Sequence, residues 1–168
     1  KDQKWKYFFS ATYSLNNKSI YKFPQHYIRA SVQRDTKIPG QQLQFVQEDN
    51  CLLSFKRGTN DKYLYNDNYR LTYVHEYENH FSYTLGFNNW TQTPAGSLYF
   101  IGNAHSASPN VVHNLTTSEV SLQLRYAPHE QFYQGKIYRI PIPNQYPIFT
   151  AQYTRGLKNV FNSSYNYQ

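Results

Sequence analysis

Apolar and polar side chains alternate along the chain between residues 69 and 87. Apolar and aromatic residues hold every second position of two runs, Tyr69–Tyr73 and Phe81–Phe87, and the positions between them are mostly polar. Successive side chains of a β-strand point to opposite faces, so this pattern predicts a β-hairpin with one apolar and one polar face. The polar segment Glu76–Asn79 is its predicted turn.

The same alternation predicts strands along most of the chain, and no stretch has a helical period. The clearest strand covers 117–126, and the others are expected at 5–15, 26–34, 43–57 (one or two strands), 62–89 (the hairpin), 98–101 and 148–155. Polar or glycine-containing segments predict a break at 66–68 and a loop at 93–96. The sequence thus predicts an all-β, antiparallel fold of seven to nine short strands, with long loops near 102–116 and 127–147.

Function depends on whether the apolar face meets lipid or a second sheet. We expect lipid, because 18 Tyr and 11 Phe supply rings that suit the boundary between water and hydrocarbon, as in an aromatic girdle. The predicted fold class is therefore an antiparallel transmembrane β-barrel, whose strands alternate in this way. The residues expected to face lipid are Phe81, Tyr83, Leu85, Val120, Leu122, Leu124 and Phe149. The residues expected to face the lumen are Thr72, Ser82, Thr84, Ser121 and Gln123.

Charge and cysteine content narrow the partners only a little. The net charge of +7 suits anionic lipid, an acidic glycan or nucleic acid, but the basic residues are scattered and form no basic arm. Basic residues alternate with aromatic residues near Trp5 and near Tyr133, and such surfaces can stack nucleobases. Ordinary strands share that pattern, however, so we expect no nucleic-acid partner. The single cysteine, Cys51, can form no internal disulfide.

Candidate chemistry is sparse. His75 and His80 flank a turn that contains Glu76 and Glu78, where a metal is conceivable, although a solvated turn is the simpler interpretation. The sequence has no nucleophile elbow, phosphate loop or dinucleotide-binding glycine pattern. We therefore expect no catalytic residues, no metal and no cofactor, and a protein that is not an enzyme.

Four segments near the C-terminus carry a family resemblance: Leu122–Pro128, Phe132–Lys136, Tyr146–Thr150 and Tyr153–Lys158. They resemble a Bacteroidota outer-membrane family that has a carboxypeptidase-regulatory-like N-terminal domain and a surface-antigen (Omp85-type) β-barrel. The resemblance covers about residues 117–168. It implies a protein of the bacterial outer membrane, with lipid, lipopolysaccharide and other envelope proteins as partners and with no catalytic residues to carry over.

The chain also departs from that family. The accessory domain is missing, and the last residues do not form a closing amphipathic strand. We therefore expect residues 1–168 to be a single, incomplete barrel domain, an interior portion of a larger barrel that acts as a pore, scaffold or subunit of an envelope assembly. The alternative is a soluble β-sandwich that binds glycan or protein through aromatic loops, with Trp90, Tyr99 and residues 127–147 as its contact surface.

Overall fold

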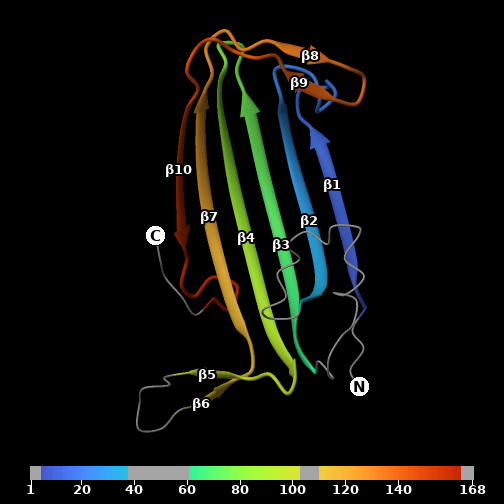
Figure 1. The fold of residues 1–168 in the computed structure, drawn as a ribbon, viewed down its shortest axis with the longest axis vertical. Helices are drawn as coiled ribbons and strands as arrows, with labels where there is room; N and C mark the ends of the chain where they lie inside the picture. The colour runs from blue at the N-terminus through green and yellow to red at the C-terminus, as the bar shows by residue number, and fades with distance from the viewer. Residues whose placement is uncertain (1–4, 38–60, 103–109, 164–168) are drawn as a thin grey trace, which may run out of the picture.

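The protein folds as an open six-stranded antiparallel sheet with the strand order β1-β2-β3-β4-β7-β10 (Figure 1). The structure, a computed structural model, describes residues 5–37, 61–102 and 110–163. The sheet strands are β1 (Tyr7–Ser14), β2 (His26–Lys37), β3 (Lys62–Glu76), β4 (Phe81–Gly96), β7 (Leu115–Tyr126) and β10 (Phe149–Gly156). Two small hairpins accompany them, β5 (Phe100–Gly102) with β6 (Asn110–Val112) and β8 (Phe132–Gln134) with β9 (Arg139–Pro141).

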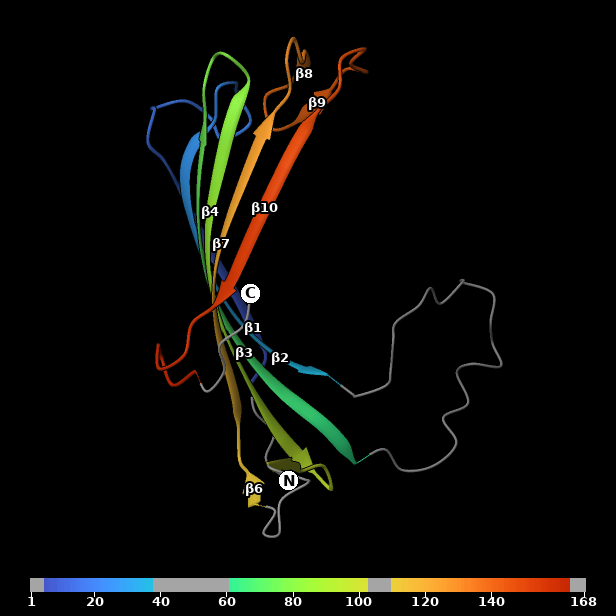
Figure 2. The same ribbon diagram turned by 90° about the vertical axis from the view of Figure 1, so that its left-hand side faces the viewer.

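The sheet is a single twisted layer, and no second layer of described residues packs on either face (Figure 2). The buried hydrophobic residues among those described are only Tyr65 and Ala127. A soluble domain of this size normally buries most of its large apolar side chains. Here the expected interior of a sandwich is absent from the described part of the chain, and the apolar residues lie open on the sheet.

The two small hairpins mark the two ends of the sheet (Figure 1). Residues 127–147, here called the strap, leave β7 and form the β8–β9 hairpin before the chain enters β10. We call this end of the sheet the strap end, and the opposite end, next to β5 and β6, the far end. Strands β3 and β4 connect at the strap end through a tight turn in which His80 has a positive φ of 63°.

The predicted β-hairpin is confirmed, and its strands pair antiparallel from Glu76↔Ser82 to Lys62↔Gly96. The strands expected at 5–15, 26–34, 117–126 and 148–155 correspond to β1, β2, β7 and β10. The strands expected at 43–57 lie outside the described residues. The all-β, antiparallel class is thus confirmed, although several strands are longer than the short ones expected, up to 16 residues in β4.

Two predicted interruptions are wrong. The break expected at 66–68 lies inside β3, where Asn66 and Asp67 bond across the ladder to Trp90 and Arg34 and so compensate for poor strand propensity. The loop expected at 93–96 belongs to β4. Pairing of β4 with β7 stops at Gln92↔Leu115, so Pro94 lies where β4 has a neighbour on one side only, and its missing N–H costs no ladder bond.

The long loops are partly structured. Residues 102–116 include β6 and the start of β7, and the strap contains β8 and β9 with their four prolines in the connecting segments or at the end of β9. The described ranges form an open sheet rather than a closed barrel, so the finer barrel class is not shown here. No helix suitable for crossing a membrane occurs among the described residues.

Candidate functional site

The sheet separates apolar and polar side chains onto two faces, as the alternation predicts. The register pairs Tyr83 with Leu124 and Leu85 with Leu122, and it places both Phe81 and Phe149 opposite Tyr126. Because paired residues project to the same face, all seven residues expected to face lipid share one face, here called the apolar face. This face is open: Leu85 is 43 % exposed and Phe149 is 61 % exposed.

The residues expected to face the lumen share the opposite, polar face. Thr84 pairs with Gln123, and Gly86 of β4 lies between Thr72 of β3 and Ser121 of β7. A Cβ at Gly86 would clash with the Ser121 hydroxyl oxygen, so a larger residue here would require that hydroxyl to rotate away. The grouping of these residues is therefore confirmed, whereas their contact with lipid or with a lumen stays a prediction.

The apolar face ends obliquely toward the far end. On β10, β7, β4, β3 and β2 we identified the last apolar residue before the polar positions begin. These residues are Tyr153 (β10), Val120 (β7), Phe87 (β4), Tyr69 (β3) and Val32 (β2). Polar residues of the same face follow on β10 to β2, namely Arg155, Ser118, Asn89, Asp67 and Arg34.

The ladder gives the slope of this boundary. Paired residues form rows at right angles to the strands. Val120 lies one row beyond Tyr153, and Tyr69 lies one row beyond Phe87, while Phe87 shares a row with Val120 and Val32 with Tyr69. Each step is two residues, so the two steps are about 13 Å along the strands, and the four strand spacings from β10 to β2 are about 19 Å across them. The boundary is therefore inclined by about 35° to the rows.

Aromatic rings with polar atoms gather where the apolar face meets the strap end. His75 stacks between His26 and Tyr77, with ring centroids 4.2 and 4.3 Å away. The hydroxyl of Tyr73 lies 3.0 Å from His26 Nε2 and 3.3 Å from His75 Nδ1. Such rings combine an apolar body with a satisfied polar edge. His80 instead stacks on Phe23, and within the described ranges no three His, Cys, Asp or Glu side chains are grouped to hold a metal.

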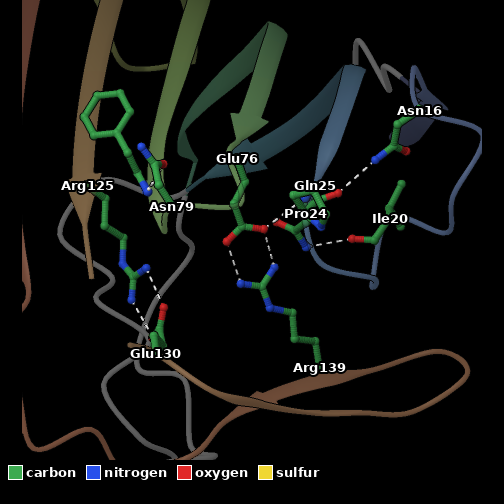
Figure 3. Close-up of polar contacts among 10 residues, drawn as sticks. Asn16, Ile20, Pro24, Gln25, Glu76, Asn79, Arg125, Glu130 and Arg139 are labelled. Carbon is green, nitrogen blue, oxygen red and sulfur yellow. Dashed lines mark hydrogen bonds and ion pairs between the residues drawn. The ribbon is translucent and has the colours of Figure 1, made fainter. Parts of the chain in front are cut away.

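The polar face is closed at the strap end by a buried ion pair (Figure 3). Arg139 of β9 donates two hydrogen bonds to the Glu76 carboxylate, at 2.7 and 2.6 Å, and the side chains are only 12 % and 7 % exposed. The backbone N–H of Gln25 donates a third bond to Glu76. The guanidinium lies 3.4 Å from the ring centroid of Phe132. The strap is thus attached to β3 and to the β1–β2 connection.

A second ion pair holds the start of the strap (Figure 3). Arg125, on the polar face of β7, donates two bonds to the carboxylate of Glu130, at 2.8 and 2.6 Å. Glu130 is buried, and Arg125 is about one-third exposed. Both pairs have the two-bond geometry that makes arginine–carboxylate contacts strong and directional.

A hollow of about 290 Å³ lies on the polar face closer to the far end. We call it the Trp90 hollow, and its lining residues are Gln33, Asp35, Lys37, Asn66, Asn68, Arg70, Asn88, Trp90 and Glu119. Asn66 is 4 % exposed, and its carbonyl oxygen accepts bonds from Trp90 Nε1 and Gln92 Nε2, each at 3.3 Å. Three buried amide atoms have no partner among the described residues: Asn66 Nδ2, Asn68 Oδ1 and Asn88 Oδ1. Two further hollows lie along the same face.

The turn that follows β10 covers polar residues below the apolar boundary. The Ser118 hydroxyl, which is fully buried, donates to the carbonyl of Val160 at 2.8 Å and accepts a bond from Asn89. Phe161 packs beside Phe87, with ring centroids 5.6 Å apart. Beyond the boundary, toward the far end, this face of the sheet therefore carries polar side chains that are hydrogen-bonded to one another and to the turn after β10.

The sequence did not reveal the Trp90 hollow or the ion pairs of the strap. Trp90 was expected in a contact loop of the alternative sandwich, but it lies within β4. Because the sequence pattern predicts a break at residues 66–68, it does not place Asn66 and Asn68 on one face of a strand. Glu76 and Arg139 are 63 positions apart, and no local pattern connects them. The sequence does contain one signal for the hollow: amide side chains and a tryptophan occupy polar-face positions of two strands that are predicted to be neighbours.

Comparisons with protein-family models, with curated proteins and with solved structures found no match. The faces, the strap and the hollow are therefore the basis for a functional proposal.

Proposed function

We propose that this chain forms part of the wall of a transmembrane β-barrel in the bacterial outer membrane, where it serves as a pore, a scaffold or a subunit of an envelope assembly without catalysis. The apolar face would contact lipid, and the polar face would line the lumen. The observation that carries the proposal is the oblique boundary of the apolar face, inclined by about 35° to the rows. Strands of outer-membrane barrels are tilted by about 35–45°, so a membrane surface crosses their rows at such an angle.

The borders of the apolar face also suit a membrane contact. On β4 its apolar run, Phe81 to Phe87, covers seven residues, or about 23 Å along the strand, which at a tilt of about 35° is a height of about 19 Å. The lipid-facing band of outer-membrane barrels is about 25 Å tall and is flanked by aromatic rings. The cluster of Tyr73, His75 and Tyr77 supplies such rings at one border. Arg155 follows the band at the other border, where a guanidinium group suits the phosphates of lipid and lipopolysaccharide.

A barrel wall explains why one layer can be stable with an open apolar face. In lipid, that face needs no second sheet, and each backbone group bonds to a neighbouring strand. The outer edges of β1 and β10 have no partner strand among the described residues, so further strands would have to pair with them. The soluble sandwich remains a proposal without specific support, because the described residues supply no second layer for the apolar face.

The test is to compare neighbouring positions on the two faces in phospholipid vesicles. In a Cys51→Ser background, single cysteines replace Leu85 or Leu122 on the apolar face and Thr84 or Ser121 on the polar face, and each is labelled with a small fluorophore. We expect nitroxide-labelled lipid to quench labels at 85 and 122 strongly. A water-soluble quencher should instead reach labels at 84 and 121, provided that the lumen is wet.

The neighbouring positions serve as matched controls, because each pair shares a strand and a depth. Equal quenching of both faces by the aqueous reagent would overturn the proposal. Protection of positions 85 and 122 from both reagents would also overturn it, because that result indicates a protein layer over the apolar face.

A further inference from the structure

The Trp90 hollow contains more hydrogen-bonding capacity than the protein itself uses. The buried Asn66 Nδ2 is a donor without an acceptor, and Asn68 Oδ1 and Asn88 Oδ1 are acceptors without donors among the described residues. A buried polar atom without a partner costs about 1–3 kcal/mol. Native structures carry few such atoms, and three around one hollow require an explanation.

The unpaired atoms specify a ligand that both donates and accepts hydrogen bonds. A hydroxyl group does both, whereas a carboxylate or phosphate only accepts. Charge supports the same choice, because the hollow is lined by two acidic residues, Asp35 and Glu119, and two basic residues, Lys37 and Arg70. A balanced lining gives no preference for an anion, so a neutral ligand with several hydroxyl groups fits best.

Trp90 adds an apolar surface beside these amides. Its indole N–H is fixed by the bond to Asn66, and no other aromatic ring stacks on it in the described part of the chain. In the ladder, Trp90 lies between Asn68 of β3 and Thr117 of β7, and Asn88 is the preceding residue of the same face on β4. A sugar ring has one face of C–H groups and a rim of hydroxyls, which match an aromatic face and a rim of amides.

We propose that the Trp90 hollow binds a neutral saccharide, with one sugar ring packed on Trp90 and its hydroxyl groups bonded to Asn66, Asn68 and Asn88. The inference rests on the polar face alone and does not require lipid on the other face. If the barrel proposal also holds, the hollow is a sugar-binding position on the lumen wall.

Binding is measured by isothermal titration of the full chain with maltohexaose, cellohexaose and xylohexaose. The protein is kept in an amine-oxide detergent, because that headgroup carries no sugar. We expect at least one of the three to bind saturably. The Trp90→Leu and Asn88→Leu variants should each bind it at least fivefold more weakly, whereas Gln123→Leu, on the same face but outside the hollow, should bind it as the parent does.

The two tryptophans of the chain locate the ligand. In the Trp5→Phe variant all tryptophan emission comes from Trp90 and should change on binding, whereas in Trp90→Leu the emission of Trp5 should stay constant. Absence of saturable binding for all three sugars at about 10 mM, which corresponds to a binding free energy weaker than about 3 kcal/mol, would overturn the inference. Equal affinity of the parent and Asn88→Leu, with both folded by circular dichroism, would overturn it as well. Either result leaves the lipid-quenching test unaffected.

Discussion

The two ends of the polar face treat their polar groups in opposite ways. At the strap end, Glu76 receives three hydrogen bonds and Glu130 two, and both carboxylates face an arginine in two-bond geometry. In the Trp90 hollow, by contrast, Asn68 and Asn88 each keep a buried carbonyl oxygen without a donor among the described residues. Glu76 and Asn68 lie on the same face of the same strand, β3, so the difference in their hydrogen bonding depends on position along the strand rather than on the fold.

This contrast separates a structural role from a functional one. A fully bonded polar network fixes one arrangement of the chain, here the strap against the sheet. Unpaired buried amides weaken the fold and are expected where a binding site has a use for them. Substitutions at the strap end should therefore reduce stability, whereas substitutions of Asn68 and Asn88, whose carbonyl oxygens have no donor among the described residues, should leave stability nearly unchanged.

Removal of Glu76 should give the largest effect. In Glu76→Ala, Arg139 stays buried beside Phe132 without a counter-ion, and breaking such a pair costs about 3–5 kcal/mol. The loss should appear as faster amide hydrogen exchange in the strap and as a lower free energy of unfolding. The double variant Glu76→Ala/Arg139→Leu removes the unpaired charge and should recover part of the loss. An unchanged exchange rate in the strap would show that the ion pair does not hold it.

Removal of Glu130 should have a smaller effect of the same kind. Arg125 is about one-third exposed, so in Glu130→Ala water can solvate part of its charge, and we expect a loss of about 1–2 kcal/mol. The measurement is again the free energy of unfolding, together with exchange at the start of the strap. A loss as large as that of Glu76→Ala would mean that burial of the arginine does not set the difference between the two pairs.

How much of this could be predicted from the sequence depends on the range of the interactions. Alternation specifies which residues share a face, because side chains project in turn whatever the tertiary contacts are. Leu85 and Leu122 could thus be assigned to one face and Thr84 and Ser121 to the other. Element boundaries were less accurate: Asn66 to Asn68 and Pro94 have poor strand propensity, but cross-strand bonds and a one-sided ladder position allow the strands to continue.

The sites could not be predicted, because they are made by register. The Trp90 hollow needs Asn68 beside Trp90, and this placement follows only from pairing two strands that are each 15 or 16 residues long. The ion pair of Glu76 depends on the path of the strap through its prolines. A sequence pattern of local period carries no information about either one.

Asn68→Leu should have the smallest effect on stability, and it tests the contrast most directly. Leucine has nearly the shape of asparagine, and the substitution removes a buried carbonyl oxygen that has no donor, so the free energy of unfolding should change by less than about 0.5 kcal/mol or increase. Asn66→Leu is the matched control. It removes an oxygen that accepts bonds from Trp90 and Gln92, and we expect a loss of about 1–3 kcal/mol. If Asn68→Leu lowered the free energy of unfolding as much as Asn66→Leu, the Asn68 carbonyl would have a structural hydrogen-bond partner. The polar groups of the hollow would then be structural, like those of the strap end. If the two differ as expected, the Asn68 carbonyl has no partner within the sheet, and a ligand of the Trp90 hollow would supply the donor that the described residues do not.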